Sequence, residues 1–136
     1  MAAMSDYLEV ELLNAVLRGT SYTGGAVYLA LHTADPTDSS TANEITDSAY
    51  TRQQMHSASV SDGFTVPHAT GGYVTNDNVI TFPAVADGSV TITHMSLWTA
   101  SSGGNMLMHG ALSPAKTLAV SDTITFPQNE ITITLS

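Results

Sequence analysis

Short stretches in which apolar and polar residues alternate constrain this chain more than any other feature of its sequence. Ile131, Ile133 and Leu135 alternate with threonines, and Ile124 and Phe126 do the same just before them. This period of two is typical of a strand with one buried and one exposed face. Turn residues separate the stretches. The pattern predicts strands over Ala26–Thr33, Tyr50–Ser57, Asn78–Phe82, Val90–Thr99, Met106–Leu112, Thr123–Phe126 and Ile131–Leu135.

Prolines mark several of the predicted strand ends. The segments Asn78–Pro83 (NVITFP) and Asp122–Pro127 (DTITFP) resemble each other and both close on Phe-Pro. Proline has no amide hydrogen for the sheet ladder, so we interpret the echo as repeated strand-end chemistry and not as a duplicated domain. Ser113-Pro114 likewise predicts a turn after Met106–Leu112.

One stretch has the period of a helix. Ser5 suits the N-cap, and Gly19 suits the left-handed position after the last turn. Leucine, alanine and valine recur between them at three- and four-residue spacing. We predict a helix over Ser5–Arg18 that packs its leucine stripe on one sheet or on an open end of the β-structure.

These elements predict one domain over residues 1–136, with the helix at 5–18 and the β-structure at 26–135. The expected fold class is mostly β, an antiparallel β-sandwich or jelly-roll-like barrel with one N-terminal α-helix.

The charge balance argues against several partners. The chain has 12 acidic residues against three basic ones and a formal net charge of −9. Nucleic-acid binding requires clustered cations, and an anionic membrane surface would repel this chain. There is no cysteine, no apolar run long enough to span a membrane and no secretory signal. We expect no nucleic-acid or membrane partner, and synthesis in a host cytoplasm.

No pattern of catalytic or metal-binding residues is present. The five histidines lack HxH or HExxH spacing, although His94 and His109 lie on consecutive predicted strands and could face each other. The acids of the loop Ala34–Ser48 could bind calcium, but they lack EF-hand spacing, which favours a solvated acidic loop. We therefore expect no enzyme activity, no cofactor and no metal. Trp98, Met95, Met106 and Met108 are predicted core residues.

The order of features resembles a family of small bacteriophage virion proteins, labelled tail-fibre-like, some of which act as capsid cement or decoration proteins. The resemblance rests on Ser5–Gly19, Ala26–Thr37 (AVYLALHTADPT), Tyr50–Gln53, Asn78–Pro83, Val90–Thr99, Gly103–Leu112, Lys116–Phe126 and Ile131–Leu135. Ser121 departs from the family, which usually has glycine in that turn.

The resemblance implies a virion structural protein without enzyme activity. Because the chain is short and has no fibre-like repeat, we expect a capsid cement protein on the capsid exterior that binds between capsomers. Its expected partners are the major capsid protein and other copies of itself, as a dimer or trimer. The alternatives are a tail or tail-fibre component and a glycan-binding β domain.

The predicted contact surface is the outer face of the helix together with the acidic loop and one cation. Its residues are Asp35, Asp38, Glu44, Asp47 and Arg52. Arg52 is one of only three basic residues and could bridge to a partner carboxylate. The alternative is an internal salt bridge to Asp47 or a neighbour.

Overall fold

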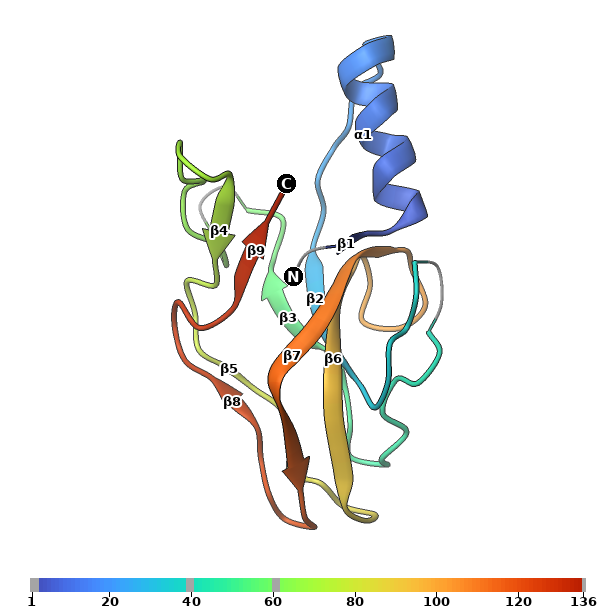
Figure 1. The fold of residues 1–136 in the computed structure, drawn as a ribbon, viewed down its shortest axis with the longest axis vertical. Coiled ribbons are helices and arrows are strands. Elements are labelled where there is room, and N and C mark those ends of the chain that lie inside the picture. The colour runs from blue at the N-terminus through green and yellow to red at the C-terminus, as the bar shows by residue number, and fades with distance from the viewer. Residues whose placement is uncertain (1–2, 39–40, 60–61, 136) are drawn as a thin grey trace.

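Antiparallel strands form most of the regular secondary structure in the computed structural model, which describes residues 3–38, 41–59 and 62–135 (Figure 1). The largest sheet has the strand order β1-β7-β6-β2-β3, and every neighbouring pair is antiparallel. Its strands are β1 (Ala3–Met4), β2 (Val27–His32), β3 (Gln53–His56), β6 (Val90–Trp98) and β7 (Met106–Leu118). Two further pairs lie beside it: β4 (Tyr73–Thr75) with β9 (Thr132–Thr134), and β5 (Ile80–Thr81) with β8 (Thr125–Phe126).

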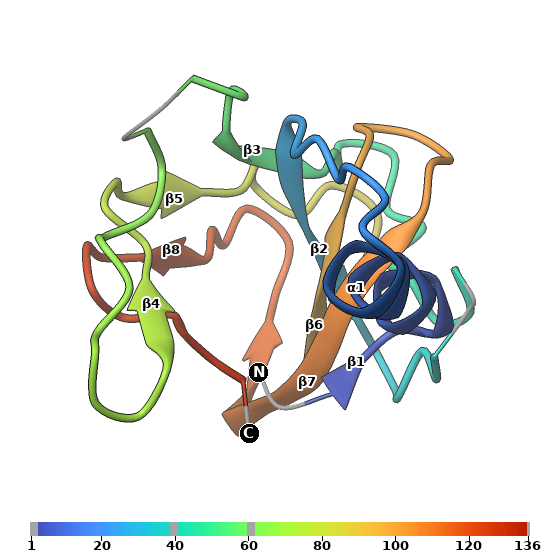
Figure 2. The same ribbon diagram turned by 90° about the horizontal axis from the view of Figure 1, so that it is seen from above.

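The core lies between the five-stranded sheet and these two ribbons, which Figure 2 shows on the same side of the sheet. Leu29 and Leu31 of β2 and Leu97 of β6 supply the sheet side of this cluster. The other layer contributes Phe82, Phe126 and several isoleucines. The predicted mostly-β, antiparallel fold with one helix is therefore confirmed, and its two layers are sandwich-like.

The two echoing segments pair with each other. Ile80 lies opposite Phe126, and Thr81 lies opposite Thr125. The threonine hydroxyls are 3.1 Å apart on the exposed face. A similar alternation thus gives both strands of this ribbon one dry and one wet face.

Strand β7 corrects the prediction of a turn at Ser113-Pro114. The strand continues to Leu118, because its register against β6 shifts between Ile92 and His94 and Pro114 falls inside that irregularity. Proline is tolerated in a sheet at a bulge, where the missing amide hydrogen breaks no ladder bond.

The helix α1 (Asp6–Arg18) ends where the cap residues predict. The Ser5 hydroxyl accepts from the Leu8 amide, and Gly19 adopts φ 69°. We expected the leucine stripe to pack on a sheet or on an open end of the β-structure, and only its first turn does so, through Tyr7 and the half-buried Leu8. The expectation is wrong for the rest of the stripe, since none of the thirteen residues of α1, all of them described, is buried and the leucines from Leu12 onward are exposed. The ribbons already cover one face of the sheet, and α1 extends away from the β-structure (Figure 1).

Candidate functional site

The predicted contact residues lie in the loop that follows β2, and the structure gives each of them contacts within the chain. Asp38 accepts from His109 Nε2 on β7 at 2.8 Å, and Asp35 Oδ1 lies 3.4 Å from His109 Nδ1. The Asp38 carbonyl also accepts from the amide of Asp6 at the start of α1. This part of the loop therefore connects the base of the helix to the sheet.

Glu44 and Arg52 form a nearly buried ion pair. Arg52 Nε and Nη2 donate to the two Glu44 carboxylate oxygens, both at 2.8 Å, and Nη1 donates to the carbonyls of Ala100 and Gly103. The guanidinium also lies 4.0 Å from the centre of the Trp98 ring. A bidentate, stacked arrangement of this kind uses the planar fork that lysine lacks. The internal salt bridge left open by the sequence is thus present, with Glu44 and not Asp47 as partner.

The same cluster shifts the pKa of two groups. Burial opposes ionisation of Glu44, but the hydrogen bonds and charge of Arg52 outweigh it and hold the pKa of Glu44 below its ordinary value. The Tyr50 hydroxyl donates to Glu44 and accepts from the Leu31 amide. Burial raises the pKa of Tyr50 well above its usual range.

Asp47 holds the other end of the loop. Its carboxylate accepts from the amides of Ala86 and Asp87, and Asp87 in turn accepts from the amide and hydroxyl of Ser48. The amide of Asp87, followed by those of Ala49 and Ala86, lowers the pKa of Asp47. The carboxylate is therefore a structural acceptor between two turns.

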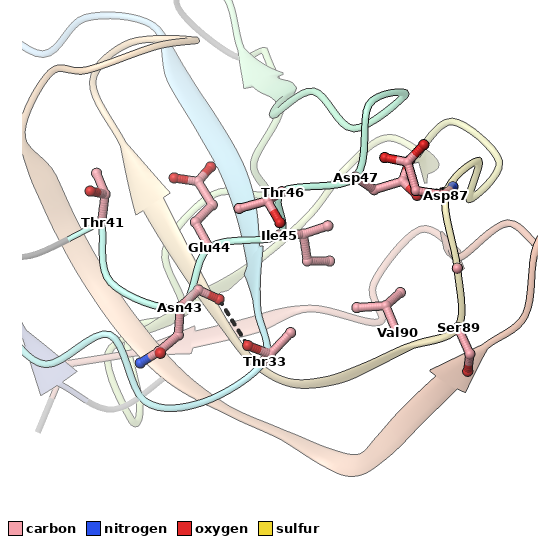
Figure 3. Close-up of a pocket in the computed structure, with 11 residues that line it drawn as sticks. Thr33, Thr41, Asn43, Glu44, Ile45, Thr46, Asp47, Asp87, Ser89 and Val90 are labelled. Atoms are coloured by element: carbon pink, nitrogen blue, oxygen red, sulfur yellow. Dashed lines mark hydrogen bonds between the residues drawn. The ribbon is translucent and has the colours of Figure 1, made fainter.

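A surface hollow of about 580 Å³, lined mostly by polar residues, runs along this loop (Figure 3). Figure 3 shows Asp47 and Asp87 close together at one end of it and Thr41 at the other. Thr33 bonds to the Asn43 carbonyl across its floor. No group of three or more acidic or histidine side chains among the described residues is arranged to hold a metal ion. The carboxylates here serve as hydrogen-bond acceptors for the loop.

A series of hydrogen bonds connects Trp98, Ser96 and His32 to the loop after β2. Trp98 Nε1 donates to the Ser96 hydroxyl at 2.7 Å, and Ser96 lies 2.6 Å from His32 Nε2. His32 Nδ1 lies 3.1 Å from the Ala42 carbonyl. Because a carbonyl only accepts, Nδ1 carries the proton and Nε2 accepts from Ser96. Burial lowers the pKa of His32. The lowered pKa favours the neutral ring, which is the form that these hydrogen bonds from Trp98 through Ser96 to His32 require.

His94 and His109, which the sequence placed on consecutive strands, do not lie opposite each other in the register of β6 and β7. His109 pairs with Ser96, and His94 pairs with Ala111. Trp98, Met95, Met106 and Met108 are buried, which confirms their predicted place in the core.

The aromatic residues do not form a glycan platform. Trp98 is buried, Tyr50 stacks on Phe82, and Tyr73 stacks on His68 elsewhere. Tyr22 lies exposed in the segment after α1.

The outer side of α1 presents a different kind of surface. Five of its large apolar side chains are between 41% and 73% exposed. We call them the α1 apolar face: Val10, Leu12, Leu13, Val16 and Leu17. Large apolar side chains exposed together on one helix make this face the candidate interaction surface of the molecule. The sequence predicted both the apolar stripe and a contact surface on the outer side of this helix, but it placed the stripe against the β-structure.

No helix among the described residues has the length and apolar character needed to cross a membrane. No curated protein matches the chain. A family model described as "Podophage GP4 fiber I protein gp80" matches residues 3–134. The resemblance to small phage virion structural proteins is thereby confirmed, and because the match spans nearly the whole sequence, the chain belongs to the podophage GP4 fiber I protein gp80 family.

Proposed function

We propose that this protein is a non-enzymatic structural subunit of a podophage fibre and that the α1 apolar face holds it in the assembled particle. The observation that carries the proposal is the exposure of five large apolar side chains on one projecting helix. Burying a fully exposed side chain of this kind contributes about 1.5–3 kcal/mol, and because these five are 41–73% exposed, each would gain roughly half of that in an assembly.

The polar part of the molecule supports the same function. In the three described segments, every buried side-chain nitrogen or oxygen that belongs to a non-exposed residue has a hydrogen-bond partner. The acids and Arg52 of the loop after β2 bond within that loop, to β7 and to the turns before and after β6. Such groups stabilise a rigid module, whereas a catalytic site requires groups free to act on a substrate.

The family description names a fibre protein, which supports the choice of fibre over capsid cement in this proposal. The alternative is a cement role on the capsid exterior, with the major capsid protein as partner. The two roles predict different particles when the protein is missing. Particles without a cement protein have shells that rupture on heating or at low salt, while particles without a fibre subunit have intact shells and lack an appendage.

The test uses phage particles that lack this protein, complemented with the wild type, with the double variant Leu13→Glu/Leu17→Glu, or with Val66→Glu. Val66 is 84% exposed and lies outside the helix, so it controls for an added surface charge. We expect electron microscopy to show fibres with the wild type and Val66→Glu and none with the double variant. Normal fibres on double-variant particles, or ruptured shells with normal fibres, would contradict the proposal.

A further inference from the structure

Among the described residues, the hydrogen bonds and core contacts that attach α1 to the β-structure lie in its first turn. The Ser5 amide donates to a carbonyl of β7 at 3.0 Å, and the Asp6 amide donates to the Asp38 carbonyl at 3.3 Å. Tyr7 and Leu8 are the helix residues that pack against the core. The helix is about 20 Å long, so it is held at one end and projects at the other (Figure 1).

The segment that follows α1 is also open to solvent. Figure 1 shows it running back from the far end of the helix to β2. Every residue from Val16 to Gly25 is exposed. The Thr20 amide donates to the Asn14 carbonyl of the helix at 3.1 Å, and residues 21–25 make no hydrogen bond to the described part of the β-structure. This segment is therefore attached to the helix and not to the sheet.

Tyr22 also joins this segment to the helix. Burial, followed by the nearby Tyr7 and Glu11, raises the pKa of Tyr22. Tyr7 and Glu11 are half-buried and four residues apart, so they lie on one side of α1, away from the α1 apolar face. The segment thus covers the side of the helix that the sheet leaves open. We call α1 together with residues 19–25 the α1 arm.

Local features within α1 stabilise it as a helix without help from the sheet. Ser5 caps its start and Gly19 caps its end. Acidic residues in the first turn and Arg18 in the last turn interact favourably with the helix dipole. Arg18 also donates to the Asn14 side chain four residues before it. Because these interactions lie within the helix, α1 can change its angle to the sheet and remain helical.

A pair of glycines lies where the α1 arm rejoins the sheet. Neither Gly24 nor Gly25 has a positive φ, and a Cβ added to either one would meet no atom within 4 Å. Backbone conformation and available space would therefore both permit a larger residue. Two successive glycines that neither requirement explains give the chain a flexible connection at this point.

We infer that the α1 arm is a rigid arm that swings about its first turn, with Gly24-Gly25 as its second hinge. A tilt of about 15° moves the far end of a helix about 20 Å long by about 5 Å. The protein then presents the α1 apolar face at a range of angles while its core stays intact. This inference concerns the free protein and goes beyond the proposed function, because it holds whatever surface covers that face.

Distances between pairs of spin labels measure the swing, and the chain has no cysteine that would take up a label elsewhere. A label at Lys116→Cys on β7 is paired with one at Leu17→Cys on α1 or, as the control, with one at Gln54→Cys on β3. All three residues are exposed, so the labels need no repacking. We expect the distribution of Leu17–Lys116 distances to be wider than that of Gln54–Lys116 by about 5 Å. Equal widths would overturn the inference.

The double variant Gly24→Ala/Gly25→Ala tests the hinge. Alanine restricts the backbone at both positions without a clash, so the Leu17–Lys116 distribution should narrow toward the width of the control pair. Gly88→Ala is the matched control, because an added Cβ there also meets no atom within 4 Å and the residue lies just before β6, outside the α1 arm. A double variant with the full wild-type width would contradict the assignment of the hinge to Gly24-Gly25.

Amide hydrogen exchange distinguishes a swinging helix from one that melts. The amides of residues 12–18 have their helical partners within α1, so we expect them to exchange at least about tenfold more slowly than in an unfolded chain. Exchange at the unfolded rate would show that the helix itself melts, and the rigid arm would be wrong.

The outcome for the proposed function is read separately, on particles. If the distance distribution is wide but particles with Leu13→Glu/Leu17→Glu carry normal fibres, the swing stands and the proposed docking through the helix fails. If the distribution is narrow and those particles lack fibres, the docking stands and the swing fails.

Discussion

Replacing Arg52 by methionine is the sharpest test of what holds the loop after β2 to the sheet. Methionine keeps a long side chain beside Trp98 but removes the charge and all donors. The change leaves Glu44 without its bidentate partner and leaves the carbonyls of Ala100 and Gly103 without a donor. The side chains of Arg52 and Glu44 are only 4% and 16% exposed, so water cannot readily replace these bonds.

The expected loss in the free energy of unfolding is large. Removing one partner of a buried ion pair costs about 3–5 kcal/mol, because the other charge remains buried and uncompensated. The slight exposure of Glu44 favours the lower end, about 3 kcal/mol. With an unfolding entropy of about 2.1 cal/mol/K per residue, a chain of 136 residues then melts about 10 °C lower.

Urea denaturation and thermal melting followed by circular dichroism measure this loss. Arg18→Met is the matched control, since Arg18 is an exposed arginine with one long hydrogen bond, and we expect a change of less than about 0.5 kcal/mol. Arg52→Met/Glu44→Gln should recover part of the loss, because it removes the stranded charge. A destabilisation below about 1 kcal/mol for Arg52→Met at neutral pH would refute the reasoning.

Three further predictions address other parts of the fold. Ser5→Ala should cost about 1–2 kcal/mol of unfolding free energy, measured by urea denaturation, because the buried Ser5 hydroxyl both caps α1 and donates to the Met106 carbonyl; a neutral result would contradict this role. Gly63→Ala should destabilise strongly in a thermal melt, because the added Cβ would lie 1.9 Å from the Met55 carbonyl oxygen at φ +79°, whereas Gly88→Ala meets no atom within 4 Å and serves as its control. The pKa of His32 is lowered in the folded state, so the unfolded chain binds more protons below about pH 6.5 and stability falls as pH drops through that window. His32→Gln should flatten this part of the stability profile relative to the wild type, and an unchanged slope would refute it.

The parts of the fold that local chemistry specifies could be predicted from the sequence. The limits of α1 follow from Ser5 and Gly19, whose capping roles need only neighbouring backbone groups. Strands β2 and β6 are long enough for their composition and flanking turns to show them. The two-residue strand β1 and the three-residue strand β4 carry no such pattern and exist through pairing with β7 and β9. Chain segments this short take their conformation from tertiary partners.

For the loop after β2 too, the sequence predicted some features and not others. Its acidic composition marked it as a region of interest, and its residues remain a predicted contact surface. The pairing of Arg52 with Glu44 instead of Asp47 depends on how the loop folds back over Trp98. The spacing of residues along the sequence does not show which side chains a folded loop brings together, so the partner of Arg52 could not be identified from it.

The apolar stripe of α1 shows why a correct helix prediction gave a wrong packing prediction. Apolar residues spaced three and four apart indicate that one side of a helix is apolar, but they do not indicate which surface covers that side. Here the sheet has its own cover, in the ribbons β4–β9 and β5–β8 and in the loop after β2. The stripe therefore remains exposed on a chain that is otherwise rich in polar and acidic residues. Because the buried polar groups of the described residues are satisfied internally while the stripe is exposed, the helix is the surface through which we propose that the protein assembles.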